Sequence, residues 1–251
     1  MKLAVLSDIH GNARALDAVR EDIARRGIER IVHLGDSLYG PFDPRPVAEV
    51  LLTQDWPTVA GNEDRCLIEV GSGRPVPATA RFIVGQLRPE HLHWLEQLPK
   101  TIEIDGFGFA FHGTPQDSAT YLLTLPLESG ATRAARADEI ADQLRTVDRP
   151  LILCGHDHLP RVVRLPDGRT IVNPGSVGCP AFTDDAPIRH GVANGSPHAR
   201  YAVVADEGNA YRADLIAIAY DWSAAADEAS RNGFQDWSDW LRTGHAGKLA
   251  S

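Results

Sequence analysis

The chain alternates between short apolar runs and longer segments whose apolar residues recur every three or four positions. Short apolar runs are typical of buried strands, and the longer recurrence is typical of helices packed on one face. The runs predicted to be strands are residues 3–6, 31–34, 58–60 and 151–154. The segments predicted to be helices are residues 13–27, 46–52, 89–98 and 138–144.

The second half of the chain is dominated by predicted hairpins, in which two apolar runs flank a short Gly-containing turn. These hairpins pair residues 101–105 with 107–111, 161–165 with 169–172, and 201–205 with 210–218. Residues 71–77 are rich in Gly and Pro and are predicted to be a loop, and the polar stretch 183–200 is predicted to be a surface loop. After Tyr220 the pattern is helical again, with Phe234, Trp237 and Leu241 on one face.

Together these patterns predict an α/β fold of mixed type, in which helices cover layered sheets with mixed strand directions. The 251 residues suit one domain, or one domain with an appended piece, and are enough to bury a sizeable core. We predict a main domain over residues 1–220 and a C-terminal helical extension over residues 221–251 that packs on the same domain.

Polar clusters follow five of the predicted strands directly. Ligands of open α/β sheets bind beyond the carboxyl ends of the strands, so we expect these clusters to meet at one edge if the strands are parallel neighbours. The glycines at the start of several clusters fit sharp exits from strands, where the backbone passes close to a site. The clusters are residues 7–12, 35–36, 61–64, 112–113 and 155–158.

The clusters contain carboxylate, amide and imidazole groups, a combination typical of metal ligands. Oxygen and nitrogen donors without thiolate suit manganese, iron, zinc or nickel better than calcium. One catalytic ion must keep open positions, so this many donors indicates two ions that share a bridging carboxylate, roughly 3.5–4 Å apart. Each aspartate alone would be typical of a cap, but their combination with the histidines favours metal. The predicted ligands are Asp8, His10, Asp36, Asn62, His112, His156 and His158.

In this order, the motifs of the chain resemble those of the calcineurin-like metallophosphoesterases. The resemblance rests on Asp-Ile-His at 8–10, Gly-Asp at 35–36, Gly-Asn at 61–62, a lone histidine at 112 and Gly-His-Asp-His at 155–158. Asn-Pro-Gly-Ser-Val-Gly at 173–178 is similar to the small bacterial and archaeal phosphodiesterase branch of that family. The resemblance implies a four-layer α-β-β-α sandwich with two mixed β-sheets.

The resemblance also implies a role for each ligand. Asp8, His10 and His158 would hold one metal ion, and Asn62, His112 and His156 would hold the second. Asp36 would bridge the two ions, and a hydroxide bridging them would attack the phosphorus in line. Manganese is our first expectation for both ions, with iron, zinc or nickel as alternatives.

The chain departs from many family members at Glu63, because they carry a histidine there that helps to protonate the leaving group. We therefore expect Asp36, Asn62 and Glu63 to take part in catalysis, with Glu63 as the proton donor if its pKa is raised. A carboxylate beside two cations tends to stay ionised, so water on a metal is the alternative donor.

Two further residues near the motifs are candidate substrate contacts. Asn12 is placed to hydrogen-bond a phosphate oxygen, with a local turn as the alternative. Arg65 is placed to bind phosphate, with a solvated or structural role as the alternative. The remaining six histidines are not expected to be ligands. His33 is expected to pack inside a strand, and His91 and His93 are expected on the surface of a helix. The others lie in polar or terminal segments: His190, His198 and His245. Trp222, Trp237 and Trp240 are expected in core or dimer packing.

Composition narrows the choice of partners and compartment. The formal net charge of −9 argues against a large phosphate-backbone footprint, so long nucleic acid is not expected as a partner. No apolar run approaches the roughly 18 residues of a membrane span, and no signal peptide is recognised. The three widely spaced cysteines are expected to be free thiols in a reducing compartment. We therefore expect a cytoplasmic monomer or homodimer.

The favoured hypothesis is a metal-dependent phosphodiesterase or phosphatase that hydrolyses a small phosphodiester or nucleotide. Alternatives within the family are a dinucleoside polyphosphate hydrolase, acting for example on diadenosine tetraphosphate, and a protein phosphatase. A different class of function is a non-catalytic binding scaffold of the same fold, such as the retromer scaffold subunit, which resembles these enzymes but lacks a complete ligand set. Every ligand position is filled in this chain, which favours an enzyme.

Overall fold

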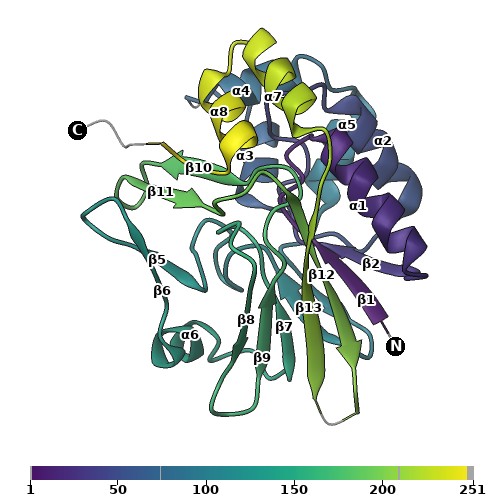
Figure 1. Ribbon diagram of the computed structural model, residues 1–251, viewed down its shortest axis with the longest axis vertical. Coiled ribbons are helices and arrows are strands. Elements are labelled where there is room, and N and C mark those ends of the chain that lie inside the picture. The colour runs from purple at the N-terminus through teal and green to yellow at the C-terminus, as the bar shows by residue number, and fades with distance from the viewer. Residues whose placement is uncertain (1, 74, 209, 248–251) are drawn as a thin grey trace.

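The computed structural model describes residues 2–73, 75–208 and 210–247 (Figure 1). The strands are β1 (Lys2–Leu6), β2 (Arg30–His33), β3 (Thr101–Ile104), β4 (Gly108–Phe111), β5 (Thr124–Pro126), β6 (Thr132–Ala134), β7 (Leu151–Leu153), β8 (Arg161–Arg164), β9 (Thr170–Asn173), β10 (Ala181–Asp184), β11 (His190–Ala193), β12 (Ala199–Asp206) and β13 (Tyr211–Ile218). The helices are α1 (Ala13–Arg25), α2 (Arg45–Gln54), α3 (Asn62–Ile68), α4 (Ala78–Val84), α5 (Pro89–Gln97), α6 (Ala137–Gln143), α7 (Trp222–Arg231) and α8 (Gln235–Thr243). No helix among these residues is long and apolar enough to cross a membrane.

Two larger sheets carry the structure. The first has the strand order β13-β12-β1-β2, in which β1 and β2 are parallel and β12 and β13 are antiparallel additions. The second has the order β3-β4-β7-β9-β8, with a parallel centre and antiparallel outer strands. The pairs β10-β11 and β5-β6 form separate two-stranded sheets. All three predicted hairpins are present, although residue 209 in the last turn lies outside the described residues.

The alternation of side chains along β1 explains how the layers pack. Leu3 and Val5 point between the two sheets, where they meet Leu153 and Val172 of the second sheet. The intervening residues of β1 point the other way, into a core that they share with α1, α2 and the C-terminal helices. The outer face of the second sheet packs against α6, on the other side of the molecule from α1 and α2 (Figure 1). The mixed α/β fold and the four-layer arrangement are therefore confirmed.

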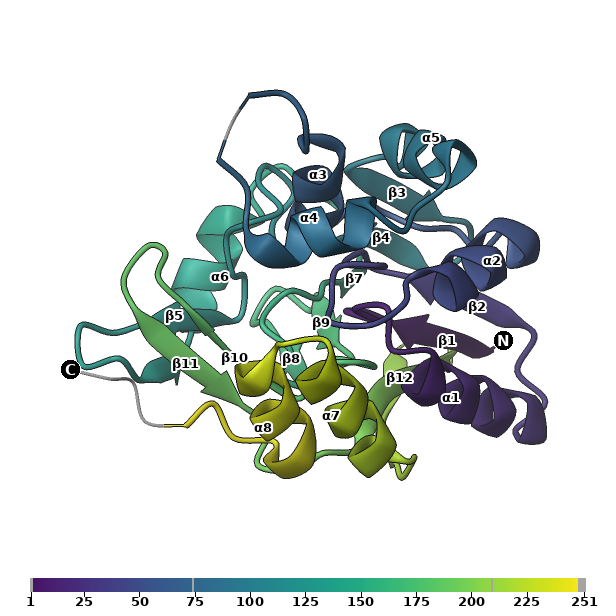
Figure 2. The same ribbon diagram turned by 90° about the horizontal axis from the view of Figure 1, so that it is seen from above.

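The two C-terminal helices pack into the main core. Ala225, Ala226 and Ala229 of α7 and Trp237 and Leu241 of α8 belong to the same buried cluster as the helix-facing residues of β1. Figure 2 shows both helices beside α1 and in front of the β10-β11 pair. The division of the chain at residue 220 stays a prediction.

Several local predictions differ from the structure. Residues 183–200 are not an irregular loop, because much of this stretch forms the hairpin of β10 and β11. Residues 58–60 contribute a single bridge, from Thr58 to His33, rather than a strand. Helices α3 and α4, of seven residues each, were not predicted, because α3 begins inside the polar cluster 61–64 and α4 follows the Gly- and Pro-rich loop. His91, a residue of α5, is buried rather than exposed, and its Nδ1 accepts a hydrogen bond from the backbone N–H of Arg88.

Candidate metal centre

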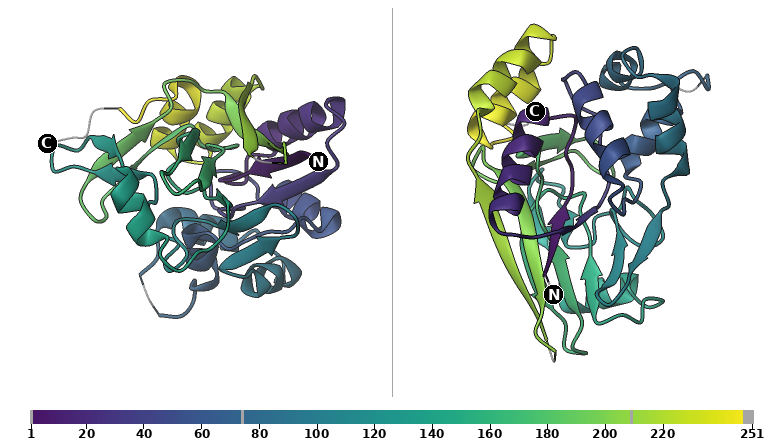
Figure 3. Two further views of the ribbon diagram at one scale, coloured as in Figure 1. Left: turned by 90° about the horizontal axis from the view of Figure 1, so that it is seen from below. Right: turned by 90° about the vertical axis from the view of Figure 1, so that its right-hand side faces the viewer.

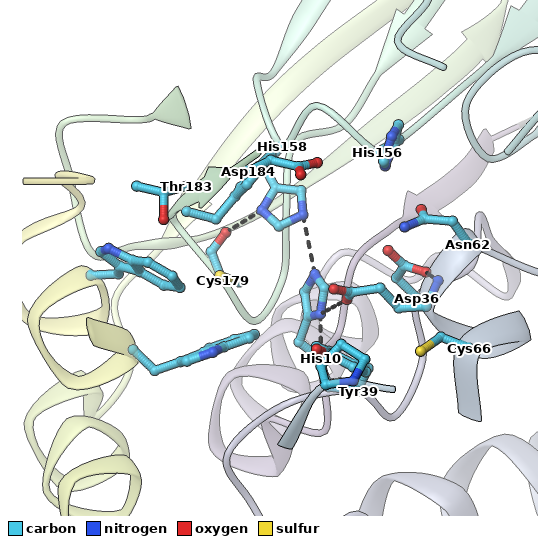
Figure 4. Close-up of a pocket in the computed structure, with 15 residues that line it drawn as sticks. His10, Asp36, Tyr39, Asn62, Cys66, His156, His158, Cys179, Thr183 and Asp184 are labelled. Carbon is cyan, nitrogen blue, oxygen red and sulfur yellow. Dashed lines mark hydrogen bonds and ion pairs between the residues drawn. The ribbon is translucent and has the colours of Figure 1, made fainter. Parts of the chain in front are cut away.

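The loops that follow β1, β2, β4 and β7, together with the start of α3, meet where the two sheets adjoin (Figures 3 and 4). The polar clusters thus come from both sheets rather than from the edge of one. Ligand atoms of Asp8, His10 and His158 lie within 4.8 Å of one another, as do those of a second group. The second group consists of Asp36, His112 and His156. We call these six residues with Asn62 the ligand cage.

The backbone of the cage is held in a conformation that residues other than glycine rarely adopt. Asp8, His10, Asp36, His156 and His158 all have φ between 52° and 69°. Only one other non-glycine residue with positive φ, Asp55, occurs in the described chain. Such left-handed positions cost of order 1–3 kcal/mol each in sparsely populated regions and cluster at functional sites. The surrounding loops therefore hold these side chains in place against local backbone preference.

Two imidazoles of the first group face each other in a way that calls for a cation. The Nδ1 of His10 lies 2.8 Å from the carbonyl of Tyr39, and the Nδ1 of His158 lies 2.7 Å from that of Cys179. Because a carbonyl only accepts, each Nδ1 carries the proton and each neutral ring presents a lone pair at Nε2. The Nε2 atoms of His10 and His158 are 3.1 Å apart, and Oδ1 of Asp8 lies 3.3 Å from Nε2 of His158. Two lone pairs and a carboxylate at such distances repel one another unless a cation lies between them.

The second group repeats this arrangement. His112 Nδ1 donates to the carbonyl of Leu34 at 2.6 Å, which leaves its Nε2 pointing at Asp36 Oδ2, 3.2 Å away. His112 Nε2, Asp8 Oδ1 and Asn62 Oδ1 are buried without a hydrogen-bond partner. Buried polar atoms without partners are rare in native proteins, and an ion is one of the few explanations. The donor set of imidazole, carboxylate and amide therefore fits a pair of first-row divalent metals.

The pKa values of two cage residues also indicate that the site attracts positive charge. Burial lowers the pKa of His112, but the carboxylates of Asp36 and Asp8 outweigh it and raise that pKa to about 10. Burial raises the pKa of Asp36, but His112 and His10 lower it to about 2. The protein without metal thus keeps Asp36 ionised and holds a proton on His112, which a bound metal ion would replace.

Asp36 is placed between the two groups. It belongs to the second group and also to a third set of atoms within 4.8 Å of one another, with His10 and Glu63. Its Oδ1 accepts a hydrogen bond of 2.9 Å from the backbone N–H of Glu63, while its Oδ2 faces His112. The position is compatible with a carboxylate shared by two ions.

Asp64 fixes the position of Asp36, and sequence reasoning gave it no role. Its buried carboxylate accepts backbone N–H groups of Asp36 at 2.9 Å, Ser37 at 2.9 Å and Gly61 at 3.0 Å. It thereby ties the loop after β2 to the first turn of α3, which carries Asn62. An acidic residue three positions after a glycine that precedes a helix is a capping-box signal, which could have found this residue.

Asp157 and Asn173 support the loop that carries His156 and His158. Asn173 donates from Nδ2 to the carbonyl of Gly155 at 2.9 Å and to Asp157 at 2.7 Å, and Thr124 donates to the other oxygen of Asp157 at 2.6 Å. Farther along the same turn, Ser176 donates to the carbonyl of Asp8 at 2.8 Å. These contacts give the Asn-Pro-Gly-Ser turn a supporting role for the loops of the cage.

Comparison with known proteins identifies the family. The sequence profile of the calcineurin-like phosphoesterase superfamily domain matches residues 1–192. The chain belongs to this superfamily. The match covers the whole ligand cage, and the resemblance predicted from the motifs is confirmed.

Relatives of this calcineurin-like phosphoesterase extend over its full length. An uncharacterized protein of Methanocaldococcus jannaschii is 27% identical, and the alignment covers 94% of each chain. A metallophosphoesterase from Sphaerobacter thermophilus has a similar structure, with a TM-score of 0.74 and 26% identity over 97% of this chain and 100% of the other. A hypothetical protein of Pyrococcus horikoshii, 22% identical with a TM-score of 0.73 and 99% of each chain covered, shares the fold.

Glu63, the departure from many members of the superfamily, lies against a ligand. Its Oε2 is 3.1 Å from His10 Nδ1. Burial and the charge of Asp36 raise the pKa of Glu63 to about 7, against the opposing effect of His10. This position suits a residue that orients His10, in addition to the proton-donor role, which stays a prediction.

The two predicted substrate contacts are engaged elsewhere in this structure. Asn12 caps α1 by accepting from the N–H of Ala15, and its Nδ2 donates to the carbonyl of Gly178 and to the hydroxyl of Tyr220. Arg65 donates to the carbonyl of Leu98 at 2.9 Å and does not line the pocket described below. These contacts favour the local-turn alternative for Asn12 and the structural alternative for Arg65.

Of the histidines outside the cage, His190 is connected to the candidate site through Tyr121. Its Nδ1 donates to the carbonyl of Ile188, so its Nε2 accepts from the hydroxyl of Tyr121 at 3.0 Å. The ring of Tyr121 lies 4.5 Å from that of His156, centroid to centroid. The β10-β11 hairpin thus reaches the cage through Tyr121. His33 is fully buried in β2, as predicted, and His93 is exposed, as predicted.

A pocket of about 380 Å³ opens above the cage. His10, Asp36, Asn62, His156 and His158 form its floor (Figure 4). Its sides include Tyr39, Glu63, Cys66, Phe182, Asp184, Trp237 and Trp240. The two tryptophans are buried in the core, as predicted, but they also face this pocket, a role that the sequence did not predict.

Proposed function

We propose that this calcineurin-like phosphoesterase is a dinuclear metal-dependent phosphodiesterase that acts on a small phosphodiester or nucleotide. The proposal is carried by the two facing groups of buried ligand atoms with a carboxylate between them. Asp8, His10 and His158 would hold one ion. Asn62, His112 and His156 would hold the other, and Asp36 would be shared.

The chain's own residues prepare this site before any ion binds. The Nδ1–H bonds to backbone carbonyls fix the rings of His10, His112 and His158 with their Nε2 atoms aimed inward, where a metal ion would displace any proton they carry. Asp64 and the turn at 173–178 fix the loops, so little reorganisation is needed when ligands bind. When bound, the two ions would supply Lewis-acid charge for the phosphate oxygens and a water activated at neutral pH.

Hydrolysis in this site requires that water adds to phosphorus while one ester oxygen leaves with a proton. Glu63 lines the pocket and has a pKa raised to about 7, so it is the candidate donor for poor leaving groups. Nitrogen and oxygen donors without thiolate suit manganese, iron, zinc or nickel, and manganese is the ion that we propose first.

The test is metal add-back to metal-stripped protein, with hydrolysis of bis-p-nitrophenyl phosphate and p-nitrophenyl phosphate measured for Mn²⁺, Ni²⁺, Zn²⁺ and Mg²⁺ in turn. We expect restored activity that is higher on the diester, and two ions per chain by elemental analysis. Asp36→Asn should lower the rate at least about a hundredfold, because it removes charge shared between the ions.

Asp55→Asn is the matched control, since Asp55 also has positive φ but lies at the end of α2, outside the cage. It should leave rate and metal content unchanged. Full activity in Asp36→Asn would contradict the two-metal proposal. A folded protein that holds two ions yet hydrolyses neither ester would favour the scaffold alternative.

A further inference from the structure

One side of the pocket above the cage is lined by aromatic rings, which we call the aromatic wall: Phe182 of β10 and Trp237 and Trp240 of α8. The ring of Phe182 lies 4.5 Å from that of His158, and the ring of Trp237 lies 5.6 Å from that of His10. Trp240 continues the surface, with its ring 5.6 Å from that of Trp237. An apolar surface of aromatic rings, tilted against one another, therefore begins directly at the ligands of the first metal group.

The described residues that line the same pocket include no lysine or arginine. Its charged lining residues outside the histidines are Asp36, Glu63 and Asp184. Asp184 lies on the His158 side of the pocket, on the opposite side from Asn62 and Cys66 (Figure 4). A phosphate at the metal ions would be neutralised by them, but any further phosphate would face carboxylates without a counter-charge.

The size of the pocket agrees with a single organic group beside the reacting phosphate. Pockets for small ligands range over roughly 300–1,000 Å³, and this one, at about 380 Å³, lies near the lower limit. Aromatic rings that stack on a base or aryl group contribute binding without selecting a particular base.

We propose that the pocket selects phosphodiesters with one phosphate and one planar, uncharged aromatic group, such as a nucleobase or an aryl ring, stacked on the aromatic wall, and that it disfavours chains of two or more phosphates. This rests on the proposed function of the cage and narrows its substrate class. Phe182, Trp237 and Trp240 supply the stacking surface, and Asp184 supplies the charge discrimination. Dinucleoside polyphosphates are thereby disfavoured.

The stacking part is tested with two esters that share one leaving group, p-nitrophenyl phenyl phosphate and p-nitrophenyl methyl phosphate. In both, water adds to phosphorus and p-nitrophenol leaves, so only the retained group differs. We expect a lower KM for the phenyl ester, and a fall in the phenyl-to-methyl ratio of kcat/KM by about fivefold in Phe182→Leu and in Trp240→Leu. Trp222→Leu is the control, because Trp222 packs against His198 and does not line the pocket. An unchanged ratio in folded Phe182→Leu would overturn the stacking role.

The charge discrimination by Asp184 is tested by measuring how strongly AMP, ADP and ATP inhibit the hydrolysis of p-nitrophenyl phenyl phosphate, all at one free Mn²⁺ concentration. The three ligands share a base and differ in phosphate number, so we expect AMP to inhibit most strongly. Asp184→Asn keeps an oxygen for the turn bond that Asp184 accepts from the N–H of Ala186. In Asp184→Asn, the ratio of the inhibition constant of ATP to that of AMP should fall by about threefold. Stronger inhibition by ATP in the wild type would overturn this part.

A binding measurement separates this proposal from the proposed function. Adenosine carries no phosphate and no charge, so its quenching of tryptophan fluorescence in metal-free protein reports the aromatic wall alone. We expect quenching that is lost in Trp240→Leu and kept in Trp222→Leu. Quenching without hydrolysis of any ester would support the wall and reject the phosphodiesterase. Hydrolysis of both esters, without quenching and without a preference for the phenyl ester, would support the phosphodiesterase and reject the stacking role of the aromatic wall.

Discussion

The ligand cage and the aromatic wall are in contact, yet they are built in different ways. The cage is made of loops with left-handed backbone at five positions, each held by buried hydrogen bonds from neighbouring loops. The wall comes from regular elements, β10 and α8, whose side chains pack in or against the core and also line the pocket. A displacement of the cage should therefore destroy chemistry, whereas a change in the wall should alter selectivity.

The strongest expected effect comes from adding one methyl group to the cage. A Cβ at Gly61 would lie 2.0 Å from Asp36 Oδ1 and 2.5 Å from its backbone nitrogen. Gly61→Ala must therefore displace Asp36, and a shift of about 1 Å at a reacting centre costs about a hundredfold in rate. Gly85→Ala is the control, because Gly85 also has negative φ and its Cβ would meet nothing closer than 3.4 Å. The loss of activity is measured as metal content and diester hydrolysis of the two variants. Equal activity would show that the cage accommodates the added methyl group without displacing Asp36.

A smaller effect is expected from the support of the cage. Asp64→Asn replaces one of the two oxygens that accept N–H groups of Asp36, Ser37 and Gly61 by an amide donor. Loss of such supporting contacts lowers metal affinity by about ten- to a hundredfold. Titration of metal-free protein with Mn²⁺ checks this, with Asp55→Asn for comparison. Wild-type affinity in Asp64→Asn would mean that the loop holds its shape without the carboxylate.

A pH-dependent effect on stability is expected far from both regions. Asp22 of α1 accepts hydrogen bonds from the hydroxyl of Tyr201 at 2.5 Å and from Arg26 Nε at 2.6 Å. Burial raises the pKa of Asp22, but these hydrogen bonds outweigh it and lower that pKa. A lowered pKa gives stability that is present above the unfolded value of about 3.9 and is lost as pH falls through the folded value.

Asp22→Asn should therefore reduce the free energy of unfolding by about 2 kcal/mol at pH 7, and by progressively less below about pH 4. Urea denaturation at pH 7, 5 and 3 gives the difference, with exposed Asp17→Asn as control. A difference that stays constant with pH would show that the carboxylate charge is unimportant. Diester hydrolysis at neutral pH should not change, which separates general stability from the integrity of the cage.

The smallest effect tests the connection between the hairpin and the cage. Tyr121→Phe removes the hydroxyl bonded to His190 but keeps the ring against His156. Leaving the buried Nε2 of His190 without a donor should cost about 1 kcal/mol of stability with metal content unchanged. Thermal unfolding and elemental analysis of the purified variant report both quantities. A loss of metal would show that this hydrogen bond, and not the ring contact, positions His156.

The cage was more predictable from sequence than the wall, for a physical reason. Ligands such as Asp8 and His156 follow buried strands at fixed short intervals, so local pattern and topology together bring them to one place. The wall joins Phe182 and Trp240, which no motif or shared period connects and which meet only through tertiary packing. Asn12 and Arg65 stand close to motifs in sequence, but their side chains are used in hydrogen bonds that cap α1 and join distant segments of the fold. Short helices and the hairpin after residue 180 were missed because they are stabilised by their surroundings more than by their own periodicity.

The left-handed backbone of the cage also restricts how this sequence can change over time. Asp, Asn and His tolerate that conformation better than most residues, so the residue types that bind metal also suit the shape of these loops. Replacement of His10 or Asp8 by alanine removes a ligand and strains the loop, whereas glycine removes the ligand and relaxes the strain. A lineage that abandoned catalysis but kept the fold would therefore be expected to accept glycine or asparagine at these positions before other residues. An engineer who wants an inert but well-folded version should begin with the same substitutions.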